Sequence, residues 1–350
     1  MRHNNIIYIL SSVALIVSAC SKVVPDEVAT RSIIGFNTVS TSTKAVTSKY
    51  PTDKPFRSTA FVYSGSWDTD KASSTKYIDD ALVKYNSEYT YWINYKEDGS
   101  TEDPKPWPGG TSKLTFFSYS PSSLKGRASV STDGVGISSW NVESDTGDIL
   151  VADIAKDKTK NESLAGYTGV PTNFRQKLSK IVFRFRIADE AVEGTQVKVT
   201  SISLKDVYSA GPYSRGGYDD DKWTTSSTSF KSSGWSLFSE SSGSSGSLDI
   251  EKGSFSAEKE FNMIPQRLVA SASTHPILEI GYKLSTDYGS NWESKTASCY
   301  FDENLRQEEW EKGKKYTYSI YIGVGQYPIE FDATVLDWGL SDQGTINIGG

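Results

Sequence analysis

The side chains that enzymes use most often as general bases are scarce in this chain of 350 residues. Its two histidines are His3, which lies in an N-terminal segment considered below, and His275, which precedes Pro276. A Ser-His-Asp triad or a Cys-His dyad would therefore depend on His275, and no G-x-S-x-G motif accompanies it. Carboxylates are plentiful, and a β-sandwich could place two of them across a cleft for glycoside hydrolysis, but spacing in sequence cannot reveal such a pair. We interpret His275 as a turn residue and expect no catalytic site.

Metal and nucleic-acid sites are equally unsupported by the sequence. The chain contains neither a Cys-x-x-Cys motif nor a pair of histidines with zinc-ligand spacing. Asp219, Asp220 and Asp221 follow one another in GYDDDKW, without the Asp-x-Asp-x-Asp-Gly register of a calcium loop. We interpret this run as a solvated loop and expect no metal and no cofactor. The formal charge is −6 without a cluster of lysine and arginine, so nucleic acid is not an expected partner.

Four tryptophans in predicted loops have the chemistry of a sugar-binding surface. A flat apolar ring with a polar rim can stack on a sugar, and the residues concerned are Trp107, Trp140, Trp223 and Trp235. Each of them would serve equally well in local packing. A surface lipoprotein that binds glycans as a monomer through these loop aromatics is therefore our alternative function.

The first twenty residues, MRHNNIIYILSSVALIVSAC, have the pattern of an export signal. A short polar start is followed by an apolar run from 6 to 17 and by small residues before Cys20. The ending VSAC resembles a bacterial lipobox, which implies cleavage before Cys20 and acylation of its thiol. A processed, soluble secreted protein is the alternative. We predict a signal peptide at 1–19 and a polar tether at 20–31 that holds the precursor to a membrane through its lipid.

Short runs of aromatic and β-branched residues predict strands throughout the chain. Residues 180–187, KIVFRFRI, alternate apolar and basic side chains, which predicts one buried and one solvated face. Residues 316–322 and 329–335 alternate similarly on either side of two glycines, which predicts an antiparallel pair. Helical patterns are few and short, the better one being NLRQEEWEKG at 304–313. The predicted fold class is therefore all-β and mostly antiparallel, with few short helices.

A polar interval without periodicity lies at 156–169, between two strand-rich parts of the chain. We place a domain junction there and predict an N-terminal β-sandwich domain at 32–169 and a C-terminal β-sandwich domain at 170–350. A serine-rich stretch at 224–247 predicts a long loop in the second domain.

Five segments follow one another in a distinctive order: DILVADIA, FRQKLSKIVFRFRI, FNMIPQRL, WEKGKKYTYSIYI and IEFDATVLDW. Together they resemble the fimbrillin family, the pilin subunits of Bacteroidales type V fimbriae and their lipoprotein relatives. The resemblance implies two tandem transthyretin-like β-sandwich domains and a structural or adhesive role without catalysis. It also implies a location at the outer membrane or in an extracellular fimbrium, with other fimbrial subunits as partners and surface glycans or proteins as further ones.

The resemblance also implies a route of assembly. In the family an extracellular protease removes the first strand of the precursor, and a strand of a neighbouring subunit replaces it. Carried onto this sequence, the first strand is residues 32–40, whose apolar residues are Ile33, Ile34, Phe36 and Val39. The cleavage would follow Lys44, where lysine stands in place of the family's usual arginine.

The last residues of the sequence are the predicted donor strand. Ile346 and Ile348 are two residues apart, so in an extended chain they lie on one face, as a donor strand requires. An edge strand that stays against its own domain is the alternative.

Overall fold

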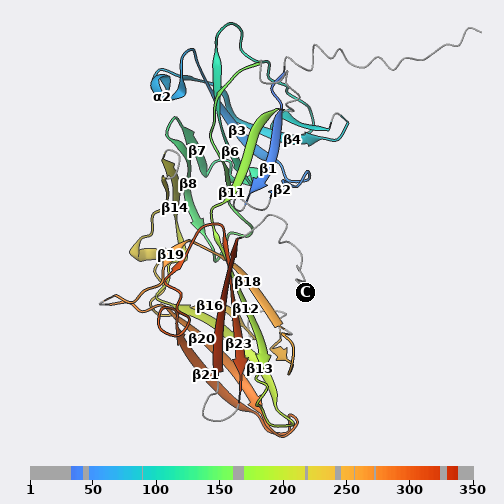
Figure 1. Cartoon of the computed structure of the whole chain (residues 1–350), viewed down its shortest axis with the longest axis vertical. Coiled ribbons are helices and arrows are strands. Elements are labelled where there is room, and N and C mark those ends of the chain that lie inside the picture. The colour runs from blue at the N-terminus through green and yellow to red at the C-terminus, as the bar shows by residue number, and fades with distance from the viewer. Residues whose placement is uncertain are drawn as a thin grey trace, which may run out of the picture.

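The computed structural model describes residues 33–41, 47–88, 90–160, 169–216, 220–240, 246–255, 257–271, 273–323 and 329–337. These residues form two β-rich lobes stacked along the long axis of the molecule, the N-terminal half above the C-terminal half in Figure 1. The predicted all-β, mostly antiparallel fold with few short helices is confirmed. Among the described residues, no helix has the length and apolar character needed to cross a bilayer.

The main sheet of the N-terminal lobe closes on itself. Its strands run in the order β10 (Ala155–Lys158), β6 (Lys113–Ser120), β3 (Phe56–Tyr63), β4 (Thr75–Asn86), β5 (Tyr91–Tyr95), β1 (Phe36–Thr41), β11 (Val170–Gln176) and β9 (Leu150–Ala152), with β2 (Thr47–Lys49) beside β1. β6 also pairs with β9, which joins the two sides of the sheet. The enclosed space holds an aromatic core that includes Phe36, Phe56 and Phe116.

A smaller sheet packs on the outside of this closed sheet. Its strands are β15 (Asp220–Trp223), β14 (Ala210–Gly216), β8 (Gly134–Asn141) and β7 (Ala128–Ser131). β6 lies between two cores: Leu114 and Phe116 belong to the inner one, and Phe117 and Tyr119 to the outer one. Both of its adjacent phenylalanines are therefore buried. The short helices α2 (Trp67–Asp70) and η1 (Ser122–Leu124) contribute to the outer core.

The C-terminal lobe is a sandwich of two sheets. One sheet runs β18 (Ala257–Met263), β12 (Ser179–Ile187), β23 (Lys314–Ile322) and β24 (Ile329–Asp337); the other runs β16 (Trp235–Ser239), β13 (Gln196–Lys205), β20 (Ile277–Ser285) and β21 (Glu293–Tyr300), with β17 (Leu248–Ile250) also paired to β13. The short pair β19 (Gln266–Arg267) and β22 (Glu309–Trp310) and the helix η3 (Ser227–Ser229) complete the lobe. One apolar core lies between the sheets.

The alternating pattern at 180–187 forms β12, and its apolar side is confirmed. The four side chains of that side are buried in the core of the C-terminal lobe: Ile181, Phe183, Phe185 and Ile187. The opposite side is less solvated than predicted. Lys180 is buried and pairs with Glu260 at 2.7 Å, and the guanidinium of Arg184 lies over the ring of Phe255 at 4.1 Å. Neighbouring side chains thus cover the basic residues on this face.

The predicted antiparallel pair is confirmed as β23 and β24. The predicted helix at 304–313 is wrong, because these residues form turns followed by β22. Trp310 explains the difference. Its side chain is fully buried, and its indole N–H donates to the hydroxyl of Tyr318 at 2.8 Å. The burial and hydrogen bond of Trp310 are tertiary interactions, and they outweigh the local helix propensity of this segment.

The N-terminal lobe uses strands from both sides of the predicted boundary at residue 170. β11 begins there and pairs with β1 and β9 in the main sheet. The hairpin β14–β15 follows β13 in the chain, yet it pairs with β8. The chain therefore enters the C-terminal lobe at β12 and returns once to the N-terminal lobe.

An ion cluster centred on Asp221 of β15 ties the two lobes together. Its carboxylate accepts hydrogen bonds from Lys177 at 2.7 Å, from Lys312 at 2.9 Å and from the hydroxyl of Tyr213 at 2.6 Å. Lys177 precedes β12 and Lys312 precedes β23, whereas Asp221 belongs to the N-terminal lobe. Burial alone would raise the pKa of the Asp221 carboxyl. The charge of Lys177 and these hydrogen bonds outweigh burial and hold the pKa well below 3.8.

We expect Asp221→Asn to lower the free energy of unfolding by about 3–5 kcal/mol, because it leaves the Lys177 ammonium buried without its counter-charge. Urea unfolding followed by tryptophan fluorescence measures this loss. The control is Asp189→Asn, which removes the exposed partner of Arg186 and should change the free energy by less than about 1 kcal/mol. A loss no larger than that of the control would contradict the role of the cluster.

The same carboxylate gives a pH dependence. Because its pKa is lower in the folded chain than in the unfolded chain, its stabilisation is present above pH 3.8 and is lost as the pH falls below that value. The difference in unfolding free energy between the natural protein and Asp221→Asn should therefore shrink below about pH 4. A difference that stays constant through this range would show that folding does not lower the pKa of the Asp221 carboxyl.

Candidate functional site: the first strand and its groove

The first strand, β1, lies inside the closed sheet between β5 and β11 (Figure 1). It runs parallel to β11 over five residue pairs. On its other side Phe36 lies opposite Trp92 of β5, and β2 pairs with residues 39–41. The strand is therefore bonded along both edges, and its removal would leave a groove between β5 and β11 with unpaired backbone groups on either side.

Phe36 is the side chain of β1 that fills the centre of this groove. It is 1% exposed, and its ring stands edge-on to Phe56 at 5.6 Å and to Phe116 at 5.8 Å between ring centroids. The same aromatic cluster also contains Tyr50, Trp92 and Phe174. Such edge-to-face pairs add about 0.5–1.5 kcal/mol each beyond the burial of their area. Loss of β1 would therefore uncover an aromatic surface that requires another apolar strand.

The approach of β1 to β11 depends on two glycines. The N–H of Val170 donates to the carbonyl of Gly35 at 2.7 Å. Gly169 has a φ of +138°, and a Cβ at this position would lie 2.7 Å from the Gly35 backbone. No side chain fits at residue 169 without moving one of the two strands. The spacing between β1 and β11 is thus set by the absence of a side chain there.

The structure describes only some of the residues predicted for strand replacement. Ile34 and Phe36 are buried, and Ile33 is half-buried. Val39 belongs to β1, although its side chain is outside the description. The acylation, cleavage and donor residues also fall outside the described residues; they are Cys20, Lys44, Ile346 and Ile348.

Three of the four tryptophans predicted in loops lie in strands: Trp140 in β8, Trp223 in β15 and Trp235 in β16. All four pack against the apolar cores. Trp140 is buried, and Trp107, Trp223 and Trp235 each lie partly buried against a core. The indole N–H of Trp223 also donates to the carbonyl of Lys177 at 2.9 Å. Much of the apolar surface of these rings is therefore already covered by the protein.

His275 and the aspartate run have structural partners. The His275 ring stacks on Tyr300 with centroids 3.9 Å apart, and its Nε2 lies 2.9 Å from Asp302. The interpretation of the run as a solvated loop is wrong for Asp221, whose partners Lys177 and Lys312 bury it; Asp219 lies outside the described residues. Across the ranges that the structure describes, no three His, Cys, Asp or Glu side chains gather as a metal site would require.

β24 is an edge strand, and within the described residues it pairs only with β23. Val335 and Leu336 are 45% and 54% exposed, two of the four large apolar side chains that the described residues expose. Val335 lies opposite Tyr316, which is buried, and residues opposite one another share a face of a sheet. The inner face of this sheet therefore continues onto β24 beyond the part that the sandwich covers.

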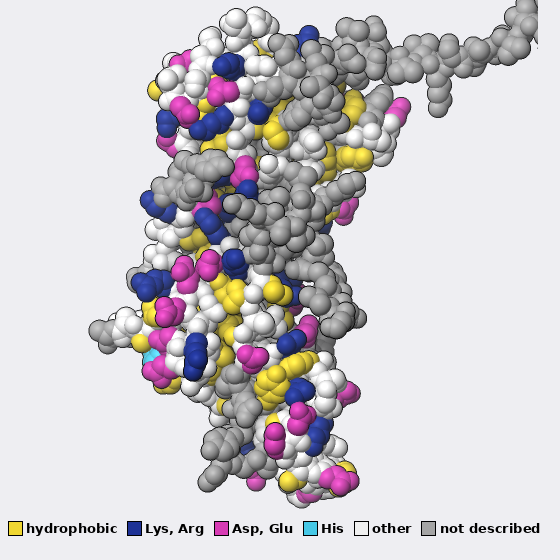
Figure 2. Space-filling model, viewed as in Figure 1, with side chains coloured by type: hydrophobic (Ala, Val, Ile, Leu, Met, Phe, Trp, Pro, Cys, Tyr) yellow, Lys and Arg dark blue, Asp and Glu magenta, His cyan; other side chains and the backbone are white. Residues whose placement is uncertain are grey.

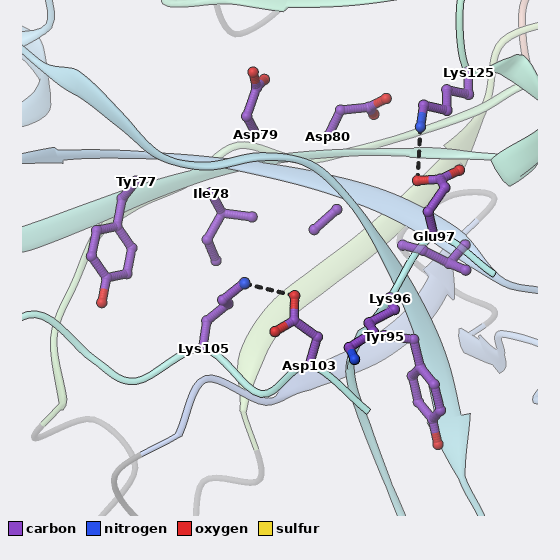
Figure 3. A pocket seen from close by; sticks show the side chains of 12 residues that line it. Tyr77, Ile78, Asp79, Asp80, Tyr95, Lys96, Glu97, Asp103, Lys105 and Lys125 are labelled. Carbon is purple, nitrogen blue, oxygen red and sulfur yellow. Dashed lines mark hydrogen bonds and ion pairs between the residues drawn. The ribbon is translucent and has the colours of Figure 1, made fainter. Parts of the chain in front are cut away.

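A polar hollow of about 460 Å³ opens on the N-terminal lobe where β4 and β5 separate (Figure 3). It is lined by residues 77–82 of β4, residues 95–97 at the end of β5, and Asp103, Lys105 and Lys125. Lys105 pairs with Asp103 at 2.6 Å, and Lys125 with Glu97 at 2.8 Å. Hydrogen bonds from Arg57 and Lys125 lower the pKa of Glu97 to about 2.

Charges of both signs are interspersed over the face of the molecule that Figure 2 shows. Lysine and arginine alternate there with aspartate and glutamate over both lobes. A nucleic-acid site needs a continuous basic surface, and this face does not present one.

The chain is similar to a known family and to solved structures. The model of a family described as fimbrillin-like matches residues 43–338. A fimbrial protein from Bacteroides vulgatus ATCC 8482 has 19% identity and a TM-score of 0.64, and the match covers 88% of this chain and 99% of that one. A candidate cell adhesion protein from Bacteroides ovatus ATCC 8483 has 14% identity and a TM-score of 0.51, covering 87% and 97%. At these identities the two structures show a shared fold. No curated protein matches the sequence.

We expect Phe36→Ala to lower the free energy of unfolding by about 3–5 kcal/mol, because it removes the ring that fills the centre of the groove. Asn37→Ala is the matched control: it changes the next residue of β1, whose side chain is exposed, and should alter the free energy by less than about 0.5 kcal/mol. Thermal or urea unfolding of the three proteins gives both values. Similar losses for the two variants would contradict the role of Phe36.

Proposed function

Since the fimbrillin-like model covers residues 43–338, the chain belongs to that family, as its ordered segments indicated, and we propose that it is a structural subunit of a cell-surface fimbria. The family match is the observation that carries this proposal. The fold shared with the fimbrial protein from Bacteroides vulgatus over nearly all of both chains supports it. In this role the protein binds other fimbrial subunits and needs neither a catalytic group nor a cofactor.

The proposal includes export as a lipoprotein. Acylation at Cys20, predicted from the VSAC ending, would hold the precursor at the outer membrane through the tether at 20–31. The proposal keeps two domains, predicted at 32–169 and 170–350, with β11, β14 and β15 from beyond residue 169 assigned to the N-terminal one. Assembly would then move the subunit from the membrane into an extracellular fimbrium.

We propose assembly by replacement of β1. Cleavage after Lys44, which lies in sequence between β1 and β2, would free the strand that covers Phe56 and Phe116. The vacated groove would expose the backbone edges of two strands and the aromatic rings that β1 had covered. A strand from a second copy of this chain would restore both the backbone hydrogen bonds and the apolar cover, which favours assembly over the open monomer.

β24 is a stronger donor candidate than the last residues of the sequence. IEFDA at 329–333 has the spacing of IGFNT at 34–38, so that isoleucine and phenylalanine stand two residues apart in both. A strand docked in that register would place a phenylalanine where Phe36 lies. Among the described residues β24 pairs only with β23, so its release would break the backbone hydrogen bonds of that one pairing. Ile346 and Ile348 remain the second candidate.

The alternative function is a monomeric surface protein that binds glycans through loop tryptophans. Binding of glycans by untreated monomer, abolished by Trp107→Ala or Trp223→Ala, would support it. The packing of both side chains against apolar cores favours the fimbrial proposal.

Limited trypsin treatment of the chain from residue 21 onward tests strand replacement. We expect detergent-resistant ladders on gels and filaments by electron microscopy, with Ala45 as the new N-terminus of the assembled chains. Lys44→Ala should reduce assembly because it removes the cleavage site. Cleaved protein that stays monomeric would reject strand replacement and leave the family assignment intact.

Variants of β24 identify the donor strand. We expect Phe331→Ala to abolish the ladders, because it removes the side chain that would replace Phe36. Leu336→Ala lies on the opposite face of the strand and should leave them unchanged, as should deletion of residues 345–350. Ladders that survive Phe331→Ala but disappear with the deletion would transfer the donor role to Ile346 and Ile348.

A further inference from the structure

The hollow on the N-terminal lobe exists because the main sheet splits beside a β-bulge. β4 pairs with β5 only over residues 82–86, and nearer its start its register with β3 shifts. Asp80 lies in this bulge with a φ of +46°, a conformation that residues other than glycine adopt rarely. The Asp80 carbonyl accepts from Arg57 at 2.8 Å, and its N–H donates to Thr59 at 3.0 Å. The buried framework therefore fixes the opening, and bulges commonly re-aim side chains at binding sites.

The lining presents hydrogen-bond donors and acceptors of both charges. The carboxylates are Asp79, Asp80, Glu97 and Asp103, and the ammonium groups are Lys96, Lys105 and Lys125. Figure 3 shows the pair of Lys105 with Asp103 and the pair of Lys125 with Glu97 on different sides of the hollow. Each pair is partly exposed. An ammonium has three N–H groups and a carboxylate about four lone-pair positions, so each paired group can also bond a ligand.

Two tyrosines add aromatic surface at the edge of the hollow (Figure 3). The hydroxyl of Tyr77 donates to the carbonyl of Pro106 at 2.7 Å, which holds its ring in place. Tyr95 lies at another side of the hollow, opposite Leu82 in the sheet register. The site thus combines two aromatic side chains with polar groups that are already oriented; the Lys84 ammonium lies over the Tyr95 ring at 5.0 Å.

From these features we propose that the hollow binds a neutral sugar unit of a surface glycan. A pyranose has C–H faces that stack on aromatic rings and hydroxyls that both donate and accept, which suits a lining of mixed charge. A ligand with a strong net charge would meet groups of its own sign wherever it bound. The volume of about 460 Å³ lies within the range of small-molecule sites. The site uses none of the four loop tryptophans and does not depend on strand replacement.

The wall that carries Lys105 is joined to the start of the first strand. The N–H of Ile34 donates to the carbonyl of Lys105 at 2.7 Å, and Ile33 forms a β-bridge with Pro106. The uncleaved protein therefore retains the contacts of Ile33 and Ile34 that hold the Lys105 side of the hollow. It is the form in which sugar binding should be measured, so that a failure of strand replacement cannot affect the result.

Saturation-transfer NMR with the methyl glycosides of glucose, galactose, mannose and N-acetylglucosamine tests the proposal. At least one glycoside should show saturable transfer from the uncleaved protein. Lys96→Ala and Asp103→Asn change partly exposed side chains of the lining, and each should weaken binding about tenfold. Lys295→Ala, on β21 of the C-terminal lobe, is the control and should leave the affinity unchanged.

Two results of these measurements would overturn the proposal. Absence of transfer with all four glycosides would reject a neutral-sugar site. Binding that both lining variants retain at full strength would place it elsewhere on the protein. Unfolding curves of the variants that match the natural protein would ensure that a loss reflects the hollow itself.

Discussion

The burial of Phe36 inside a sheet that β1 completes is the constraint on which the rest of the structure depends. The ring covers Phe56 and Phe116, while the backbone of the same strand bonds to β11 on one side and to β5 and β2 on the other. Removal of the strand would leave an apolar floor and unpaired strand edges in one place. Water would satisfy the backbone groups of the strand edges but not the exposed apolar side chains, so such a groove would favour a strand with the same apolar spacing.

The two lobes differ in whether their sheets are closed or open. The pairing of β6 with β9 closes the N-terminal sheet, so each strand of the closed circuit β6-β3-β4-β5-β1-β11-β9 has a neighbour on both sides. The C-terminal lobe is an open sandwich whose edge strand β24 exposes apolar residues. In the N-terminal lobe β1 thus lies inside the sheet, whereas in the C-terminal lobe β24 lies at an edge among the described strands. The ion cluster around Asp221 connects the two lobes.

Local periodicity was enough to predict β12 and the pairing of β23 with β24, because each alternates residues of a single core. It failed at 304–313, where the burial of Trp310 decides the conformation. It also failed at Asp221, whose ionic partners lie 44 and 91 residues away in sequence. The first strand was predicted at 32–40 from the family resemblance, and the structure has β1 at Phe36–Thr41. The polar hollow arises from a bulge and from segments that only the folded sheet brings together, so no sequence pattern could reveal it.

The most direct test of this account is a high-resolution cryo-electron microscopy map of the assembled fimbria. The account predicts that residues 329–337 of one subunit lie between β5 and β11 of the next, with Phe331 against Phe56 and Phe116 and with the subunit's own β1 absent. A map in which each subunit retains its own β1 in that groove would contradict it.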